Sequence, residues 1–519
     1  MRCKPMLWPP PILYRIHLMT YFRLLTATSA LALVAGPAMA DLTANDVWSD
    51  WQDLFARNGL EITTEGQSAS DGTLSITGIT ASFEIPDGDI AVSLGNIAFI
   101  ERSDGTVSVA MADEMPISFA IPDNDGGGTV GFTIFLPAAS MIASGDTSKV
   151  RYNYDYPELR VGDFTIDAPE MPEDFPLVMD LSLMGMTGFV ELADDDVRSY
   201  STDTDIAVFG MDFSFADPEG DEGEFSFSFS MSDLVSSATG AMGDIELDMG
   251  LSEMIGSGYR QNGTGSYGPT TYEIGFNGPD GGFEMATSAA SGTLELNFGE
   301  NGISYGGASQ DVTIFVASNM MPIPPVTLKI AETGGQFSLP IVPGEDPQDF
   351  SLEFRLTDFA IDDMLWGMFD PAGVLPRDPA TIEIDLSGKA IVTQDVTDPE
   401  FAEAMENMEM GPPGTLEELN INSVRLSFAG ADLTGDGAFV FNNDMGIPMP
   451  SGTANMMLVG ANGLMDKLVS MGLLPEEQAM GARMMLGLFA RPGNGEDTLV
   501  STIEVNEDGS ILANGQRIK

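Results

Sequence analysis

The stretch EFSFSFSMSDL, residues 224–234, alternates phenylalanine and methionine with serine. Successive side chains of a β-strand point to opposite faces, so this pattern puts the apolar side chains on one face and the serines on the other. The same period of two recurs along the chain, for example in TLSITGITASFEI (73–85), DIAVFGMDFSF (205–215) and TLELNFGENGISYG (293–306). Repeated alternation of this kind predicts antiparallel strands that bury one face.

Helical spacing is confined to a few segments. TANDVWSDWQDLFARNG (43–59) predicts an amphipathic helix that packs on the adjacent sheet. NGLMDKLVSMG (462–472) and PEEQAMGARMMLGLFARPG (475–493) predict a helical hairpin. Shorter helices are expected in TDFAIDDMLWGMF (357–369) and DPEFAEAMENMEM (398–410). The predicted fold is therefore mainly β (β-rich α+β), with long, curved, largely antiparallel sheets, an N-terminal amphipathic helix and a C-terminal helical hairpin.

The first 40 residues have the layout of a secretory signal peptide. Arg23 precedes an apolar run of about 12 residues, and Ala38-Met39-Ala40 forms a cleavage box before Asp41. We expect cleavage between Ala40 and Asp41, a periplasmic location, and no transmembrane segment in the mature chain. Met19 is a second candidate start, which would make residues 1–18 an upstream extension from a misplaced start codon.

The mature chain divides into two predicted β-rich lobes, residues 41–255 and 283–519, the second of which carries helices. Residues 256–282 are the predicted Gly-rich connection, and GSGYRQNGTGSYGPT (256–270) is its candidate loop.

Composition excludes several classes of function. The chain has 79 acidic and 21 basic residues, a net charge of −58, which disfavours nucleic-acid binding and docking to anionic membranes. The single cysteine and the single histidine, Cys3 and His17, both precede the predicted cut. Catalysis through Ser-His or Cys-His pairs and ordinary zinc sites are therefore unavailable to the mature chain. Carboxylate chemistry remains possible, although pairs such as Asp362-Asp363 are common in so acidic a chain.

Two stretches have features of metal sites. DLTGDG (432–437) matches the first half of a calcium-binding EF-hand loop, but Asn443 stands where a Glu is needed, and a tight β-turn is favoured. MENMEM (405–410) groups three methionines that could hold Cu(I), but adaptable core filling is favoured. We therefore predict no metal, cofactor or catalytic residue.

One passage is distinctive: LTDFAIDDMLWGMFDPAGVLPRDPATIEIDLSGKA, residues 356–390. Its motif residues are Trp366, Asp370, Pro371, Leu375, Pro376, Arg377, Asp378 and Pro379. The prolines predict an extended start of the following strand, and Arg377 with Asp378 is expected to form a structural ion pair there. The passage resembles the uncharacterised exported alphaproteobacterial family catalogued as domain of unknown function 2125. The resemblance covers the mature chain, most specifically from about residue 290, and implies no catalytic residue.

The closing hairpin, which ends in Asn514-Gly515, is similar to envelope proteins of the AsmA type. That similarity implies long curved sheets with an apolar trough and a link to outer-membrane assembly and lipid movement. The chain departs from that type because cleavage would remove the usual N-terminal membrane anchor.

These observations lead to one expected function and two alternatives. The expectation is a non-enzymatic periplasmic envelope protein whose sheet presents an apolar groove to a lipid or to a partner protein. The alternatives are a carboxylate-dependent hydrolase of envelope glycans and a purely structural scaffold.

Overall fold

The computed structural model describes most of the chain after the predicted leader. The described residues are 42–85, 88–121, 128–167, 176–194, 197–217, 223–243, 250–320, 324–396, 401, 412–444 and 446–519. The predicted leader with its cut between Ala40 and Asp41 lies outside this range. The predicted helix 398–410 with its methionines also lies outside it, apart from Phe401.

Strands make up most of the described chain, and the helices are few and short. The helices are α2 (Ala44–Arg57), α3 (Leu251–Gly256), α4 (Asp363–Phe369), α6 (Ala461–Ser470) and α7 (Glu476–Phe489). The strands up to the Gly-rich stretch are β1 (Glu61–Thr63), β2 (Gly66–Ser70), β3 (Thr73–Ile85), β4 (Gly88–Glu101), β5 (Val107–Ala110), β6 (Glu114–Ile121), β7 (Gly128–Phe135), β8 (Ser140–Asp146), β9 (Lys149–Asp167), β10 (Leu177–Ala193), β11 (Ser199–Ala216) and β12 (Glu224–Ala241). The remaining strands are β13 (Arg260–Tyr267), β14 (Thr270–Gly278), β15 (Gly281–Ala289), β16 (Ser291–Gly299), β17 (Gly302–Ser318), β18 (Val326–Leu339), β19 (Gln348–Ile361), β20 (Ala380–Val392), β21 (Gly414–Phe428), β22 (Ala431–Asn442), β23 (Met449–Val459), β24 (Arg491–Pro492), β25 (Thr498–Val505), β26 (Ile511–Ala513) and β27 (Gln516–Arg517).

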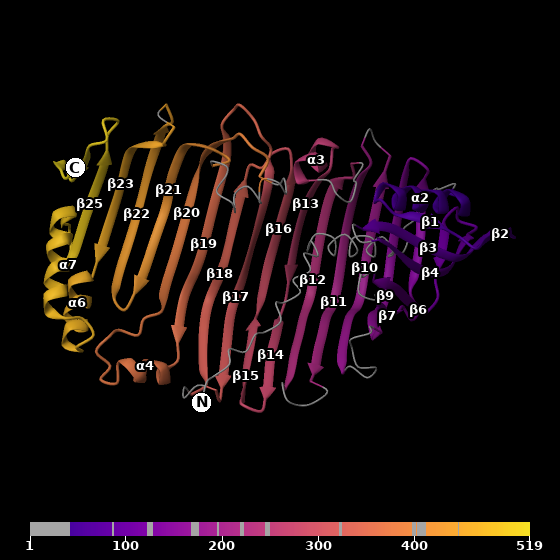
Figure 1. Cartoon of the computed structure of the whole chain (residues 1–519), viewed down its shortest axis with the longest axis horizontal. Helices are drawn as coiled ribbons and strands as arrows, with labels where there is room; N and C mark the ends of the chain where they lie inside the picture. Colours follow the sequence, from indigo (N-terminus) through magenta and orange to yellow (C-terminus); the bar gives the residue numbers. More distant parts are fainter. Residues whose placement is uncertain are drawn as a thin grey trace, which may run out of the picture.

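The strands form one sheet whose long members stand side by side from β9 to β25, and all their pairings are antiparallel (Figure 1). Helix α2 lies at the N-terminal end of this row, and α6 and α7 lie at the C-terminal end. The predicted fold class, a mainly β chain with an N-terminal helix and a C-terminal helical hairpin, is confirmed.

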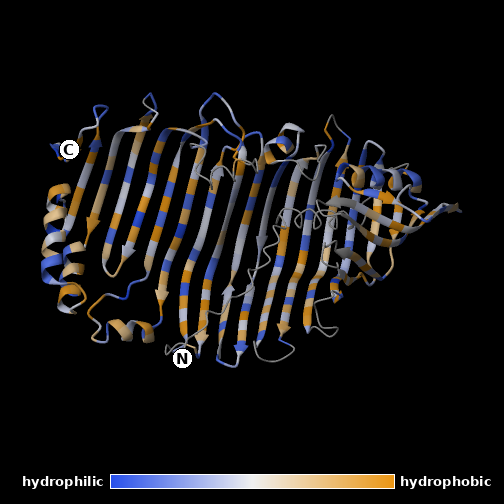
Figure 2. Cartoon of the chain, in the orientation of Figure 1, coloured by the Kyte–Doolittle hydropathy of each residue, from blue (hydrophilic) through white to orange (hydrophobic). Residues whose placement is uncertain are grey.

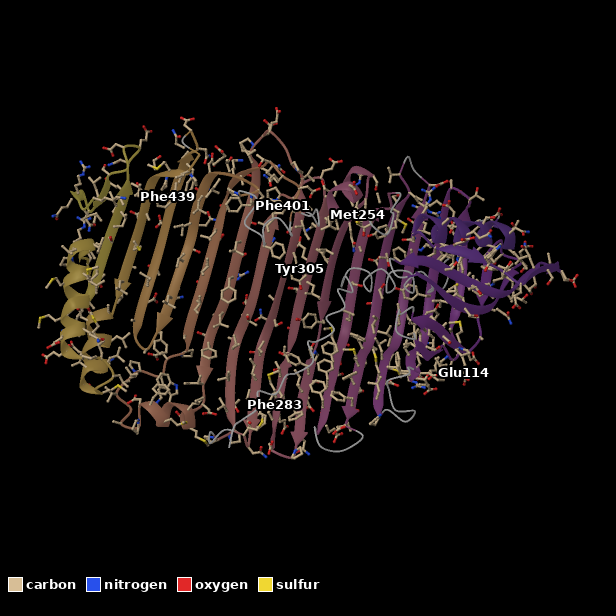
Figure 3. The ribbon with its side chains drawn as sticks, viewed as in Figure 1. Glu114, Met254, Phe283, Tyr305, Phe401 and Phe439 are labelled. Carbon is tan, nitrogen blue, oxygen red and sulfur yellow. The ribbon has the colours of Figure 1, made fainter. Side chains whose placement is uncertain are left out.

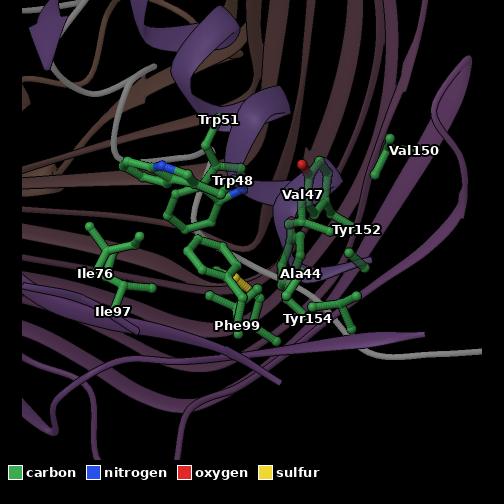
Figure 4. Close-up of a cluster of buried hydrophobic side chains, with 14 of the residues drawn as sticks. Ala44, Val47, Trp48, Trp51, Ile76, Ile97, Phe99, Val150, Tyr152 and Tyr154 are labelled. Atoms are coloured by element: carbon green, nitrogen blue, oxygen red, sulfur yellow. The ribbon is translucent and has the colours of Figure 1, made fainter. Parts of the chain in front are cut away.

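The N-terminal end holds the largest apolar core. Strand β9 pairs with β8 over its first half and with β7 over its second, and β6 lies between β7 and β4. Helix α2 packs against these strands through Val47, Trp48 and Trp51. The Trp51 ring meets the Phe99 ring edge to face at 5.4 Å (Figure 4). Burial of the two tryptophans explains why this helix packs on the sheet, as its spacing predicted.

A polar clamp also ties α2 to the sheet. Arg198 is 6% exposed, and its guanidinium donates to Asp53 at 2.6 Å and to Asp50. The Tyr152 hydroxyl of β9 donates to the same Asp50 carboxylate. Burial raises the pKa of Tyr152 well above its ordinary value, so this hydroxyl remains a donor. The N-terminal core is therefore closed by both apolar and charged contacts.

Three local predictions were wrong. The Gly-rich stretch 256–270 is not a loop: it begins with the last residue of α3, contains all of β13, and ends at the first residue of β14. Residues 357–361 continue β19, so the predicted helix 357–369 is reduced to α4. DLTGDG (432–437) is neither a tight turn nor a calcium loop, because it lies inside β22. In each case pairing with a neighbouring strand outweighs the local preference. The division into two lobes stays a prediction.

Several long strands carry one residue in the left-handed conformation near their middle. Asp233 of β12 has φ 53°, Asp311 of β17 has φ 52°, and Gly185 of β10 has φ 60°. Such a residue interrupts the alternation by one position, as a bulge does. In β10, Leu183 and Met186 both pack against the N-terminal core although they are three residues apart. The interruption therefore keeps apolar side chains on the same face along the whole strand.

Candidate functional site: an apolar sheet face

Rows of apolar side chains cross the sheet at right angles to the strands. Directly opposed residues of antiparallel strands lie on the same face, so the register defines each row. One row comprises Met179, Phe213, Phe227, Ile274, Met285, Val316 and Val326, one residue from each of seven strands between β10 and β18. The next comprises Leu181, Met211, Phe229, Tyr272, Thr287, Ile314, Leu328 and Ile361.

Comparable rows continue toward the C-terminus. One comprises Leu296, Tyr305, Phe337, Leu352, Leu386 and Ile421. Another comprises Leu356, Ile382, Leu426, Leu433, Leu458 and Leu499, from six strands between β19 and β25. Ile361 of the earlier rows packs against the buried cluster that contains Trp366, and the ring of Phe428, two residues beyond Leu426, stacks on the Trp366 ring. The two sets of rows therefore lie on one side of the sheet, and together we call them the apolar face.

The middle of the apolar face is open. Among the described residues there are three buried apolar clusters. One lies at the N-terminal end of the sheet, one surrounds Phe298 of β16, and one surrounds Trp366 of α4. Between them Tyr305, Leu352 and Leu426 are 45%, 46% and 47% exposed. Hydropathy alternates along the strands over the whole sheet (Figure 2). Tyr305 lies four residues into β17, and Phe283 lies near the lower ends of the strands (Figure 3). Exposed apolar side chains that gather on one face make that face a candidate binding surface.

The opposite face is polar and carries ion pairs. Lys389 pairs with Asp349 at 2.7 Å, and Arg425 pairs with Asp432 at 3.0 Å. Asp436, from the predicted calcium stretch, accepts a hydrogen bond from Asn455 on this face. In the part of the chain that the structure describes, no group of three or more Asp, Glu, His or Cys side chains could hold a metal ion. The sheet is thus amphipathic, and its charge lies away from the apolar face.

One open pocket of about 690 Å³ lies at the lower ends of β12, β14, β15 and β17. Its polar lining includes Glu224, Glu273 and Glu284. Glu284 is directly opposite Gly275 on β14 and Ala317 on β17, so it belongs to the polar face. These three glutamates are the carboxylates that the hydrolase alternative would use.

Two hydroxyl groups interrupt the apolar row that crosses β14 and β15. Thr287 is 6% exposed, and its Oγ1 has no hydrogen-bond partner among the residues that the structure describes. Tyr272 is directly opposite Thr287 and separates it from Phe229 of β12. A buried hydroxyl without a partner is costly, because it has lost its bonds to water and gained none.

The motif residues of the passage 356–390 gather beside the apolar face. Trp366 of α4 is buried with Leu375, and its ring stacks on the Phe428 ring at 6.4 Å. Arg377 lies 5.9 Å above the Trp366 ring and pairs with Asp363. The predicted pair of Arg377 with Asp378 is therefore wrong. The turn through Pro371 folds Arg377 back over α4, fourteen residues along the chain from its partner.

Asp370 holds the turn between α4 and β20. Its carboxylate accepts hydrogen bonds from the backbone N–H groups of Val374 at 2.9 Å and Leu375 at 2.8 Å. The bond from Val374, with that from Leu375, lowers the pKa of this carboxyl below its ordinary value. Pro376 and Pro379 continue this turn as far as β20, which begins at Ala380. The motif therefore fastens one edge of the apolar face.

Sequence reasoning found the apolar alternation but not Thr287. A threonine in an alternating strand is an ordinary β-former, so only its burial and its missing partner distinguish it. The rows across the sheet could not be predicted either, because a single sequence does not show which strands are neighbours. No helix among the residues that the structure describes is both long enough and apolar enough to cross a bilayer.

The sequence matches a model of a protein family. The model of a family described as "Uncharacterized protein conserved in bacteria (DUF2125)" matches residues 275–513. No curated protein matches the sequence. The similarity to AsmA-type proteins and an alphaproteobacterial origin stay predictions. The matched range runs from β14 to β26 and contains the motif around Trp366. The similarity to this family of uncharacterised bacterial proteins is therefore shown for residues 275–513.

Proposed function

We propose that this chain is a non-enzymatic periplasmic protein that binds the acyl chains of a lipid on its apolar face. The observation that carries the proposal is the row from Met179 to Val326, in which seven opposed residues on seven strands are all apolar. A structural scaffold would be expected to bury such rows against a second layer.

The dimensions of the face suit an acyl chain. Strands lie about 4.8 Å apart, so a row of seven strands is about 29 Å long. One leaflet of a bilayer has a hydrocarbon depth of about 15 Å. The row is therefore long enough to accept an acyl chain laid across the strands. Methionine and phenylalanine side chains adapt to flexible ligands without specific polar partners.

Charge favours contact with the hydrocarbon part of a lipid. A net charge of −58 repels anionic headgroups, and the ion pairs lie on the opposite face. The export that the leader predicts would place the chain in the cell envelope, where lipids with acyl chains are present.

The first test replaces an exposed side chain of the face. Phe354 is 42% exposed, so Phe354→Ser should leave the fold intact. It should weaken binding of the hydrocarbon probe diphenylhexatriene by about 1–2 kcal/mol, or five- to thirtyfold, because apolar contact area is lost. The matched control is Gln336→Ser on the polar face, which is one strand away. Probe fluorescence titrations measure both, and equal affinities for the two variants would contradict the proposal.

A second test identifies the ligand class. Native mass spectrometry of the gently purified protein should show a bound phospholipid or fatty acid. The hydrolase alternative predicts instead turnover of peptidoglycan or polysaccharide that is lost in Glu284→Gln. If the protein retains no lipid, does not bind the probe and shows no turnover, the scaffold alternative stands.

A further inference from the structure

The structure points to a specificity-determining site within the apolar face: we propose that the Thr287 hydroxyl, with Tyr272 opposite it, binds the ester carbonyl oxygen of an acyl lipid. This inference rests on the proposed function and adds to it the chemical group that the face recognises.

The site is defined by two hydroxyl-bearing residues that are directly opposed on neighbouring strands. Thr287 pairs with Tyr272 on one side and with Ile314 on the other, so it lies within a row of the apolar face. Along β15 it is flanked on the same face by Met285 and Ala289. Tyr272 and Thr287 are the two hydroxyl-bearing residues of a row whose other six members are Leu, Met, Phe or Ile.

A neighbouring threonine provides a contrast. Thr270, two residues before Tyr272 on β14, is also buried, at 9% exposure. Its hydroxyl donates to the Gly268 carbonyl at 3.3 Å, as buried hydroxyls ordinarily do. Thr287 is more buried and has no such bond. A valine would fill the same space without the free-energy cost of an unpaired hydroxyl. We therefore infer that the hydroxyl forms its hydrogen bond with a ligand.

The chemistry of these hydroxyls restricts the ligand. A threonine hydroxyl offers one donor and two acceptor lone pairs, and a tyrosine hydroxyl offers a donor and an acceptor. The surroundings are apolar, so a charged group would have to be desolvated without a counter-ion. The ligand group should therefore accept a hydrogen bond from a hydroxyl and carry no charge. An uncharged acceptor joined to hydrocarbon meets both requirements. The ester carbonyl of an acyl lipid has this character.

The test compares two ligands of equal size. Methyl palmitate and nonadecane each have 19 heavy atoms, and only the first carries an ester. Their affinities for the full mature chain are measured by displacement of diphenylhexatriene. The wild-type protein should bind methyl palmitate more tightly, by about two- to tenfold, the range of one net hydrogen bond. Thr287→Val should abolish this preference and leave nonadecane binding unchanged, while Thr287→Ser should retain it.

Stability provides the matched control. Thr270→Val removes a satisfied hydrogen bond, so it should lower the melting temperature and keep the ester preference. Thr287→Val should leave the melting temperature unchanged or raise it, because it removes an unpaired hydroxyl. Tyr272→Phe, which removes the opposing hydroxyl, should reduce the ester preference without loss of packing. It supplies a second variant should Thr287→Val fail to fold.

The outcomes separate the two proposals. If the wild type binds both ligands and Thr287→Val keeps the full ester preference, the Thr287 site is wrong and the acyl-binding function stands. If the wild type shows no ester preference, the site is also wrong. If neither ligand binds the wild type, the proposed function itself fails.

Discussion

At the scale of single residues, Asp370 illustrates how backbone geometry supports a buried carboxylate. It is fully buried, yet the N–H groups of Val374 and Leu375 point at its two oxygens. Hydrogen bonds from backbone N–H groups favour the ionised form and replace the lost water. The prolines on either side of Arg377 are compatible with this turn, because neither needs to supply one of those donors.

Asp370→Asn should destabilise the protein near neutral pH, since an amide nitrogen would face a backbone donor. The folded pKa of Asp370 lies below its unfolded value of about 3.9, so the folded form binds fewer protons. The wild type should therefore have this stabilisation above about pH 4 and lose it as the pH falls further. Denaturant midpoints between pH 7 and pH 2.5 measure the effect, and Asp370→Asn should show a shallower dependence.

The control for Asp370 is Asp378→Asn, at an exposed position of the same motif. It should keep both the wild-type midpoint and the wild-type pH dependence. An Asp370→Asn protein that behaves like this control would show that the turn does not depend on the carboxylate.

At the scale of elements, the left-handed residues in mid-strand keep the apolar face continuous. In β12 the apolar positions are Phe225, Phe227, Phe229 and Met231 before Asp233, and Leu234 after it. Asp233, Asp311 and Asp358 share a φ between 52° and 53°. Aspartate tolerates this conformation better than most residues, because its short side chain can bond locally.

We predict that Asp311→Val destabilises the protein by about 1–2 kcal/mol relative to Asp311→Gly, because a β-branched residue is strained at positive φ. Thr313→Val, two residues further along β17, replaces one β-branched residue by another and should have little effect. Denaturant midpoints of the three variants give the comparison. If Asp311→Val is as stable as Asp311→Gly, the left-handed position imposes no constraint.

The edge of the sheet at β25 is also protected. The Thr502 N–H donates to the Asn514 side chain at 3.1 Å, and the Ser501 hydroxyl donates to the Phe489 carbonyl at 2.5 Å. Short strands β24 and β26 pair with other parts of β25. A protected edge discourages pairing with a second chain, so the broad apolar face is the better candidate for binding.

At the scale of the whole molecule, helix α2 begins at Ala44, a few residues after the predicted cut between Ala40 and Asp41. Leu42 is 5% exposed, and Thr43 caps α2 through a reciprocal arrangement with Asp46. A cut after Ala40 would leave both residues in place.

We expect the protein from a periplasmic extract to begin at Asp41, as measured by intact mass and N-terminal sequencing. Since the cap starts at Thr43, the processed protein should have an intact α2. A leader retained in an inner-membrane fraction would contradict this expectation and favour an anchored protein.

Much of the fold was predictable, because alternation in a strand is local. The segments 73–85 and 205–215 have the period of two in the sequence and are strands in the structure. The helix over 43–59 was predictable because the one-face spacing of its apolar residues, Trp48 and Trp51 among them, lies within a few turns. The Gly-rich stretch was missed, because β13 gains its stability from pairing with β12 and β16 rather than from its own residues.

By itself, the sequence determined that apolar and polar side chains would lie on opposite faces of strands, because that depends only on the two-residue period. It also determined that neither cysteine nor histidine is present after residue 17. Only the tertiary structure decided which side chains share a row, since register joins residues as distant as Met179 and Val326. It also decided that Arg377 pairs with Asp363 and that the Thr287 hydroxyl has no partner. Burial and pairing are properties of neighbours in space, and these neighbours come from distant parts of the chain.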